Sequence, residues 1–115
     1  MRDDNMDIKI ERNGDITLLK CIGSLDAENV VFFRKKTGEL FDGGSSRFVI
    51  DANKLSFVDS MGLGAMISLM RRVREKKGDV KVFGLNAEVK EIFDITRLNK
   101  LFDVCASFEA ACKKF

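Results

Sequence analysis

Histidine is absent from this chain of 115 residues. Without an imidazole, the chain cannot by itself form a Ser-His-Asp or Cys-His catalytic constellation. Zinc sites that depend on histidine ligands are excluded for the same reason. The three cysteines, Cys21, Cys105 and Cys112, form no CxxC pair, and their odd number leaves one without a partner. This pattern favours buried thiols in a reducing cytosol over a disulfide framework.

Long apolar segments are also missing. The longest uncharged run, Ser60 to Met70, is far shorter than the roughly 20 residues needed to cross a bilayer. Residues 1–7 are mostly polar or charged and do not form a secretory leader. The net charge of +2 comes from 20 basic and 18 acidic residues that are interleaved, which argues against nucleic acid. We expect a cytoplasmic protein with no membrane insertion and no nucleic-acid partner.

The composition is typical of one soluble globular domain, with 45% apolar and 33% charged residues. A chain of this length can bury a core without disulfides or metals, so we expect a single domain over residues 1–115. Most of the ten phenylalanines lie inside apolar runs, as Phe32, Phe48, Phe57 and Phe83 do. We therefore predict that they pack in the core and do not stack on bases.

Apolar periodicity and turn residues predict an alternation of strands and helices. Asn13-Gly14 is a hairpin signal, so the first two strands should pair antiparallel. Asp26 is the predicted N-cap of the first long helix, and Gly78 is the predicted end of the second. The expected strands cover residues 7–11, 16–22, 47–52, 80–83 and 101–105, and the expected helices cover residues 27–41, 60–77, 87–95 and 107–115.

This order of elements predicts an α/β fold. We expect a mixed sheet of about five strands that opens with an antiparallel hairpin, with about four helices mainly on one face. Arg47 to Ala52 form a nearly continuous apolar run, as is typical of a central parallel strand.

The most informative segment runs from Phe48 to Gly64, where a buried strand and a short polar loop lead to Asp59-Ser60. These two residues open an uncharged helix, so a hydroxyl and a carboxylate lie at a helix N-terminus. Backbone N–H groups lack partners there and the helix dipole favours negative charge, so a phosphate on Ser60 would be tolerated. Either side chain could also cap the helix, which is worth about 1 kcal/mol, and the two roles are compatible.

Gly62 and Gly64 remove side chains from the first turn of this helix, at a cost of roughly 1 kcal/mol each relative to alanine. They indicate either tight packing against the sheet or a turn that a partner can approach closely. The residues alone favour neither explanation.

Two enzyme motifs are incomplete in the same segment. A dinucleotide-binding fingerprint would need a third glycine where Ile67 stands, and no Gly-Lys-Ser/Thr follows. A nucleophile elbow around Ser60 would need a glycine where Val58 stands, and the chain has no histidine. No lysine or carboxylate base is placed to replace it, so we predict that the chain is not an enzyme.

The predicted helix ends in a basic cluster. The simpler explanation is structural, because cations complement the negative end of a helix and Gly78 would end it. Docking of a partner or an anionic surface is the alternative. The cluster contains Arg71, Arg72, Arg74, Lys76 and Lys77.

Two motifs resemble the STAS domain family. The run from Leu55 to Gly64, which contains Asp59-Ser60-Met61-Gly62-Leu63-Gly64, resembles the signature of the family's bacterial anti-sigma-factor antagonists. Gly23-Ser24-Leu25-Asp26 is similar to the family's Gly-x-Leu-Asp turn before its first helix, and the order of elements agrees over residues 7–115. Met61 departs from the Ser, Thr or Ala usual in relatives, which bears on which kinase is recognised.

The resemblance implies a non-enzymatic, partner-switching regulator of sigma-factor-dependent transcription. The unmodified chain would bind an anti-sigma factor that is also a serine kinase. Phosphorylation of Ser60 would release that partner, and a serine phosphatase would reverse the modification. No metal or cofactor is implied. The expected partner-binding residues are Ser24, Asp26, Asp59, Met61, Gly62 and Leu63.

A second function is compatible with the same resemblance. STAS-like domains also serve as soluble accessory subunits of transporters or of other signalling complexes without a sigma factor. The presence of Ser60 favours the sigma-factor pathway. The sequence leaves the oligomeric state open between a monomer and a weak dimer.

Overall fold

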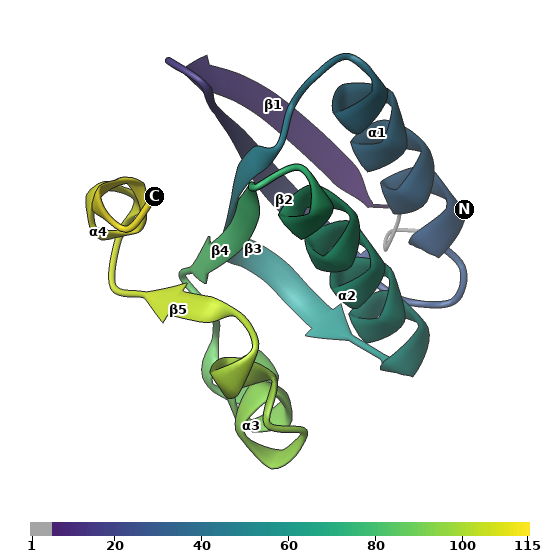
Figure 1. The fold of residues 1–115 in the computed structure, drawn as a ribbon. Coiled ribbons are helices and arrows are strands. Elements are labelled where there is room, and N and C mark those ends of the chain that lie inside the picture. The colour runs from purple at the N-terminus through teal and green to yellow at the C-terminus, as the bar shows by residue number, and fades with distance from the viewer. Residues whose placement is uncertain (1–5) are drawn as a thin grey trace.

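One sheet of five strands organises the chain, in a computed structural model that describes residues 6–115. The strand order is β1-β2-β3-β4-β5; β1 pairs antiparallel with β2, and the other neighbours are parallel (Figure 1). The strands are β1 (Asp7–Asn13), β2 (Ile16–Leu25), β3 (Arg47–Val58), β4 (Asp79–Phe83) and β5 (Asp103–Cys105). The helices are α1 (Val30–Asp42), α2 (Ser60–Glu75), α3 (Ala87–Ile95), a 3₁₀ turn at Leu98–Lys100, and α4 (Phe108–Lys113).

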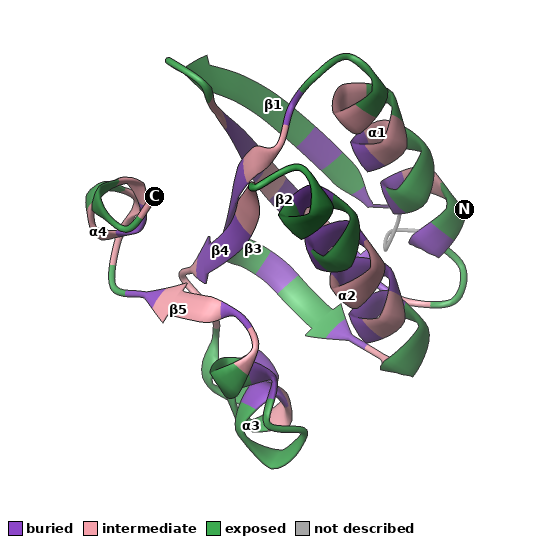
Figure 2. Cartoon of the chain, in the orientation of Figure 1, coloured by how far each residue is buried: buried purple, intermediate pink, exposed green. Residues whose placement is uncertain are grey.

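The helices cover the two faces of the sheet unequally. α1 and α2 lie side by side over one face, and α4 lies on the other (Figure 1). The main core lies beneath α1, α2 and α3 and includes Phe33, Phe48 and Phe93, whereas Leu18 and Val49 belong to a smaller cluster that packs against α4. Figure 2 shows the buried residues of α1 and α2 turned toward the sheet. The predicted mixed α/β fold with an opening hairpin is therefore confirmed.

β2 and β3 are longer than the sequence predicts. β2 continues to Leu25 and β3 to Val58, because their last residues pair with each other in parallel. The register shifts twice along this pair, and Gly23 adopts a φ of 99°, a conformation that favours glycine. These shifts interrupt the alternation of inward and outward residues. The polar residues after position 52 therefore lack the pattern of a strand, and the sequence predicts a loop there.

The prediction that Asp26 is the N-cap of α1 is wrong. α1 begins at Val30, with Asn29 at the cap position. The Asp26 carboxylate instead accepts hydrogen bonds from the backbone N–H groups of Glu28 (3.1 Å) and Asn29 (3.2 Å) and holds a turn that precedes the helix. An aspartate that accepts hydrogen bonds from its own loop in this way favours a turn over a helix, so the helix begins at a later residue.

α2 ends at Glu75, two residues earlier than predicted, and Gly78 is needed for a different reason than helix termination. The left-handed residue is Lys77, with a φ of 63°, while the N–H of Gly78 donates to the carbonyl of Val73 (2.8 Å). A Cβ at position 78 would lie 1.7 Å from the carbonyl oxygen of Ser46. Glycine is therefore required there because the backbone of the loop before β3 passes too close for any side chain.

All three cysteines are free thiols. The predicted burial is confirmed for Cys21 and Cys105, whereas Cys112 is only partly buried. Burial raises the pKa of Cys21 to about 12. Within residues 6–115, no helix combines the length and the apolar character that a bilayer crossing requires.

Lys81 is a buried cation between the sheet and α4. Its side chain is 3% exposed, and its Nζ lies 2.7 Å from Asp103 Oδ2 and 3.3 Å from Asp79 Oδ2. The ring centroid of Phe115 lies 4.8 Å from the same nitrogen. Burial disfavours the charged form of Lys81, but the two carboxylates outweigh it and its pKa is raised. In turn, the hydrogen bond from Lys81 lowers the pKa of Asp103.

This ion pair makes stability dependent on pH. We expect Asp103→Asn to lower the free energy of unfolding at pH 7 by about 1 kcal/mol, a small value because Asp103 is partly exposed. A carboxylate whose pKa is lowered by folding stabilises the fold above its unfolded pKa, and the contribution disappears as the pH falls through the folded value. Urea unfolding of both proteins between about pH 7 and 2 should therefore show the difference shrinking below about pH 4. A constant difference would contradict this assignment.

Candidate functional site

Asp59 connects the start of α2 to the loop before α1. Its backbone is extended at the N-cap of α2, and its Oδ1 accepts a hydrogen bond from the N–H of Gly62 at 2.9 Å. Its Oδ2 accepts from the N–H of Ala27 at 2.9 Å, and its own N–H donates to the carbonyl of Leu25 at 3.2 Å. One carboxylate therefore satisfies donors on two loops and fixes their relative position.

The turn that follows β2 is held by hydrogen bonds of its own. In addition to the two bonds to the Asp26 carboxylate, the side-chain amide of Asn29 donates to the carbonyl of Ser24 at 2.9 Å. Asp26 and Asp59 thus lie at the ends of the adjacent strands β2 and β3, and each carboxylate accepts two backbone N–H bonds. The site is an acidic edge with a defined backbone.

Ser60 is the first residue of α2 and is exposed to solvent. Met61 beside it is 51% exposed. Ser60 lies at the positive end of the helix dipole, next to the Asp59 carboxylate. Ser60, Asp59 and Asp26 thus lie at one edge of the sheet, and Ser60 is exposed there. That this edge binds a partner, as the family resemblance implies, stays a prediction.

Three predicted partner-binding residues are buried. Ser24 is 8% exposed and Leu63 is 9% exposed, and Gly62 lies against the end of β2. These three residues pack beneath the site and do not form its outer surface. Met61, Asp26 and Asp59 remain as the predicted residues that reach the surface beside Ser60.

The two glycines of α2 have different roles. A Cβ on Gly62 would lie 2.1 Å from the carbonyl oxygen of Leu25, so this glycine is required by close packing of α2 on β2. A Cβ on Gly64 would have no atom within 4 Å. Each of the two explanations that the sequence left open therefore applies to one glycine. Gly62 allows close packing on β2, and the space beside Gly64 is open.

Phe57 is an exposed aromatic residue beside the site. The prediction that it packs in the core is wrong: its side chain is 40% exposed, whereas Phe48 in the same strand is fully buried. The inward residues at this end of β3 are Leu55 and Val58, three positions apart, because the strand is irregular here.

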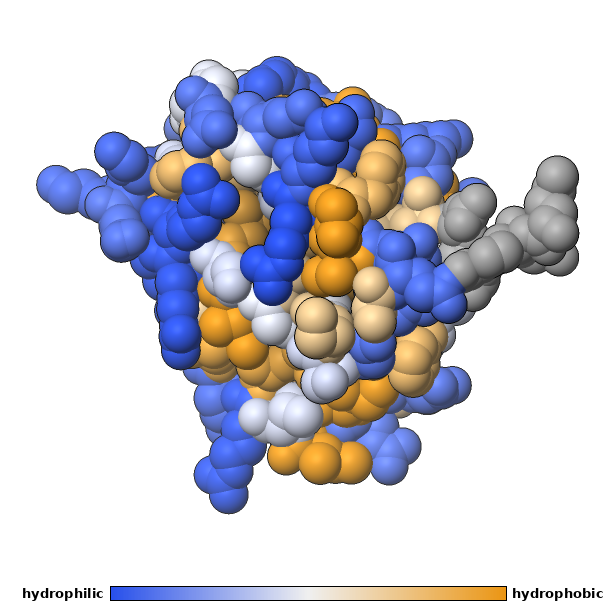
Figure 3. Space-filling model, turned by 90° about the vertical axis from the view of Figure 1, so that its right-hand side faces the viewer, coloured by the Kyte–Doolittle hydropathy of each residue, from blue (hydrophilic) through white to orange (hydrophobic). Residues whose placement is uncertain are grey.

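On the side of the molecule that carries α1 (Figure 3), apolar and weakly polar side chains form a band between hydrophilic ones.

The two glycines provide a matched pair of variants. We expect Gly62→Ala to destabilise the fold by about 2 kcal/mol or more, because the new methyl group overlaps the backbone of β2. Gly64→Ala should instead stabilise it by up to about 1 kcal/mol, because alanine favours a helix and meets nothing at this position. Urea unfolding of the two variants measures both effects, and equal effects of the same sign would contradict the assignment.

The role of Asp59 can be tested by hydrogen exchange. In Asp59→Ala, the backbone amides of Ala27 and Gly62 should exchange faster together, because both lose the same acceptor. The expected loss of stability is about 1–2 kcal/mol. Asp26→Ala is the control, since it should accelerate exchange at Glu28 and Asn29 without affecting Gly62. Faster exchange at only one of the two Asp59-bound amides would show that the carboxylate does not join the loops.

Comparison with known proteins finds relatives in sequence and in fold. The anti-sigma-B factor antagonist of Bacillus subtilis is 26% identical over 105 residues, which are 91% of this chain and 95% of that protein. An anti-sigma factor antagonist from Mycobacterium paratuberculosis has the same fold, with a TM-score of 0.88 and 17% identity over 98% of this chain and 96% of that one. The phosphorylated form of the Bacillus cell fate determinant SpoIIAA matches with a TM-score of 0.72 and 21% identity, over 95% of this chain and 100% of that one.

The family itself is established by a match to nearly the whole chain. Residues 7–111 fit the model of the STAS domain, and this span includes every strand, the paired loops at Asp26 and Asp59, and the exposed Ser60. The chain belongs to the STAS domain family.

Proposed function

We propose that this chain is an anti-sigma-factor antagonist that acts by switching partners in the cytoplasm. The unmodified form binds an anti-sigma factor that is also a serine kinase, and thereby releases a sigma factor. That kinase phosphorylates Ser60 and is released, and a serine phosphatase restores the unmodified form. The observation that carries this proposal is the exposed Ser60 at the start of α2, directly after the Asp59 cap.

A phosphate on Ser60 would leave the fold in place and change the surface. It adds about −1.5 to −2 charges and three acceptor oxygens at the positive end of a helix. The N–H of Gly62 already bonds the Asp59 carboxylate, and the N–H of Leu63 bonds the Asp59 carbonyl at 2.9 Å. These donors are therefore occupied, and much of the new charge faces a docked partner.

The resulting repulsion is large enough to act as a switch. Two like charges about 4 Å apart repel by about 4 kcal/mol at an effective dielectric constant near 20. Each 1.4 kcal/mol corresponds to about a tenfold change in affinity. A partner with one acidic group facing Ser60 would therefore be displaced by a single phosphate. The chain itself supplies the hydroxyl and the docking face, with no chemistry of its own in the cycle.

The proposal is tested by two variants of Ser60. Ser60→Ala should bind the kinase and accept no phosphate, whereas Ser60→Asp should lose binding by about tenfold or more while it remains folded. The probe is each anti-sigma factor serine kinase encoded in the source genome, purified and titrated against the wild type and both variants in the presence of ADP.

Phosphorylation is measured separately, with ATP and mass spectrometry of the intact protein. A single added phosphate on the wild type and none on Ser60→Ala would support the cycle. Circular dichroism should show the same unfolding temperature for all three proteins within a few degrees. Equal kinase affinity of Ser60→Ala and Ser60→Asp would overturn the switching model.

A further inference from the structure

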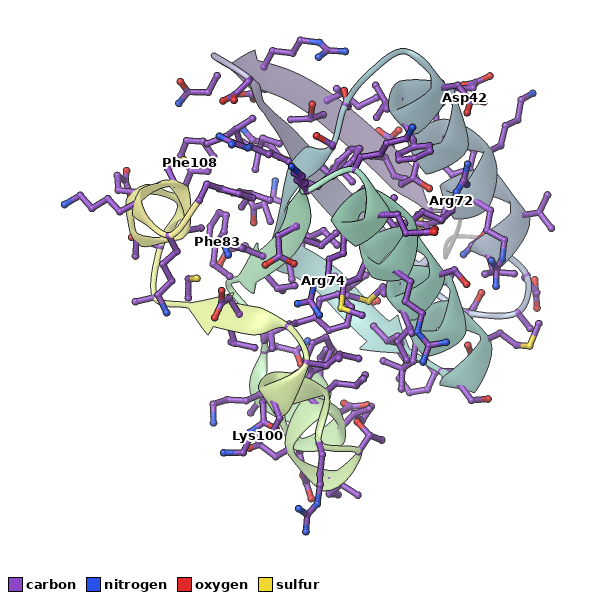
Figure 4. The ribbon with its side chains drawn as sticks, viewed as in Figure 1. Asp42, Arg72, Arg74, Phe83, Lys100 and Phe108 are labelled. Atoms are coloured by element: carbon purple, nitrogen blue, oxygen red, sulfur yellow. The ribbon has the colours of Figure 1, made fainter. Side chains whose placement is uncertain are left out.

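The structure divides the basic end of α2 into two groups of residues. Arg72 lies against α1: its guanidinium is 3.8 Å from the carboxylate of Asp42 and 4.6 Å from the ring centroid of Phe41. Arg74 binds Asp79 at 2.9 Å and the carbonyl of Leu101 at 2.8 Å. Figure 4 shows these two side chains leaving α2 in different directions. Arg72 and Arg74 therefore have structural roles within the domain.

The other three cations have no such role. Arg71, Lys76 and Lys77 are exposed, and in residues 6–115 no acidic group lies within ion-pair distance of any of them. Arg72 and Arg74, in the last turn of α2, already complement its dipole. The structural explanation of the cluster thus accounts for two of the five basic residues and leaves three unexplained.

Arg71 shares one face of α2 with Ser60. The two residues are eleven positions apart, and at 3.6 residues per turn they point within roughly 20° of the same direction, about 16 Å apart along the axis. Gly64, Ile67 and Ser68 lie between them on this face. Ile67 is partly buried against the core, Gly64 and Ser68 have small side chains or none, and a Cβ at Gly64 would meet nothing within 4 Å. An element of a partner that contacts Ser60 can therefore continue along α2 to Arg71.

We infer that the outward face of α2, from Ser60 to Arg71, is one docking surface and that it receives an acidic protein surface. Carboxylates of the partner pair with Arg71, whereas Lys76 points to another side of α2 and Lys77 lies beyond its end. This inference rests on the proposed function, because the partner is the kinase that modifies Ser60, and it adds the chemistry by which that kinase is selected.

The charge pattern favours a protein over a phosphate polymer or a lipid surface. Exposed acidic residues, Glu39 and Glu75, lie on α1 and α2. A continuous array of phosphates would meet these residues as well as Arg71, whereas a folded protein can place its carboxylates opposite Arg71 and away from Glu39 and Glu75. The overall charge of +2 is also too low to support binding to a polyanion.

The test compares two charge reversals of equal size. Arg71→Glu changes the proposed surface, and Lys113→Glu makes the same change in net charge on an exposed residue of α4, on the other face of the sheet. We expect Arg71→Glu to weaken binding of the kinase identified with the Ser60 variants by about tenfold or more. Lys113→Glu should bind like the wild type. The affinity of the wild type should fall as salt rises, and more steeply than that of Arg71→Glu.

Each outcome separates this inference from the proposed function. Loss of binding in Ser60→Asp together with wild-type affinity of Arg71→Glu would overturn the inference and leave the proposed function intact. Equal losses of kinase affinity in Arg71→Glu and Lys113→Glu would show that the effect depends on net charge alone. That result would also overturn the inference. Arg71-dependent binding to a DNA duplex or to phosphatidylglycerol vesicles would overturn the assignment to a protein partner. If the wild type binds no kinase at all, both proposals fail.

Discussion

The carboxylate of Asp59 is the constraint on which the site depends. Its two oxygens accept hydrogen bonds from Gly62 at the start of α2 and from Ala27 in the neighbouring loop. Parallel pairing of β2 with β3 brings these two loops to the same edge of the sheet, and Gly62 allows α2 to approach the end of β2. Ser60 is held at that edge because backbone hydrogen bonds and close packing fix the two loops and the start of α2.

This arrangement separates the stability of the fold from the chemistry of its surface. The cap, the turn at Asp26 and the contact of Gly62 all lie beneath or beside Ser60, and the hydrogen bonds that hold them do not involve its hydroxyl. A modification of that hydroxyl would therefore change the charge that a binding partner meets without removing an interaction that stabilises the domain. Such a site suits reversible modification.

Much of this could be predicted from the sequence, because local rules and tertiary contacts agree. The Asn13-Gly14 turn, the apolar run of β3 and the start of α2 after Asp59 are all local signals, and the structure confirms them. α3 begins and ends where its periodicity predicts. In these cases neither a register shift nor a long-range backbone contact changes the local preference.

The sequence failed where long-range geometry decides. The irregular pairing of β2 with β3 extends both strands and exposes Phe57, and no local pattern reports it. Gly78 looks like a helix terminator, yet its role comes from Ser46, which lies 32 positions earlier. The five cations at the end of α2 look alike in the sequence, and only their neighbours in space distinguish Arg72 and Arg74 from Arg71.

The distance along α2 between Ser60 and Arg71 also matters for how such proteins diversify. If Arg71 selects the kinase as inferred above, substitutions around it after a gene duplication would alter kinase preference while Ser60 and its supporting loops stay unchanged. Two copies would then operate in one cell with little crosstalk between their pathways. A helix of 16 residues is long enough to keep the two determinants apart on a single rigid element.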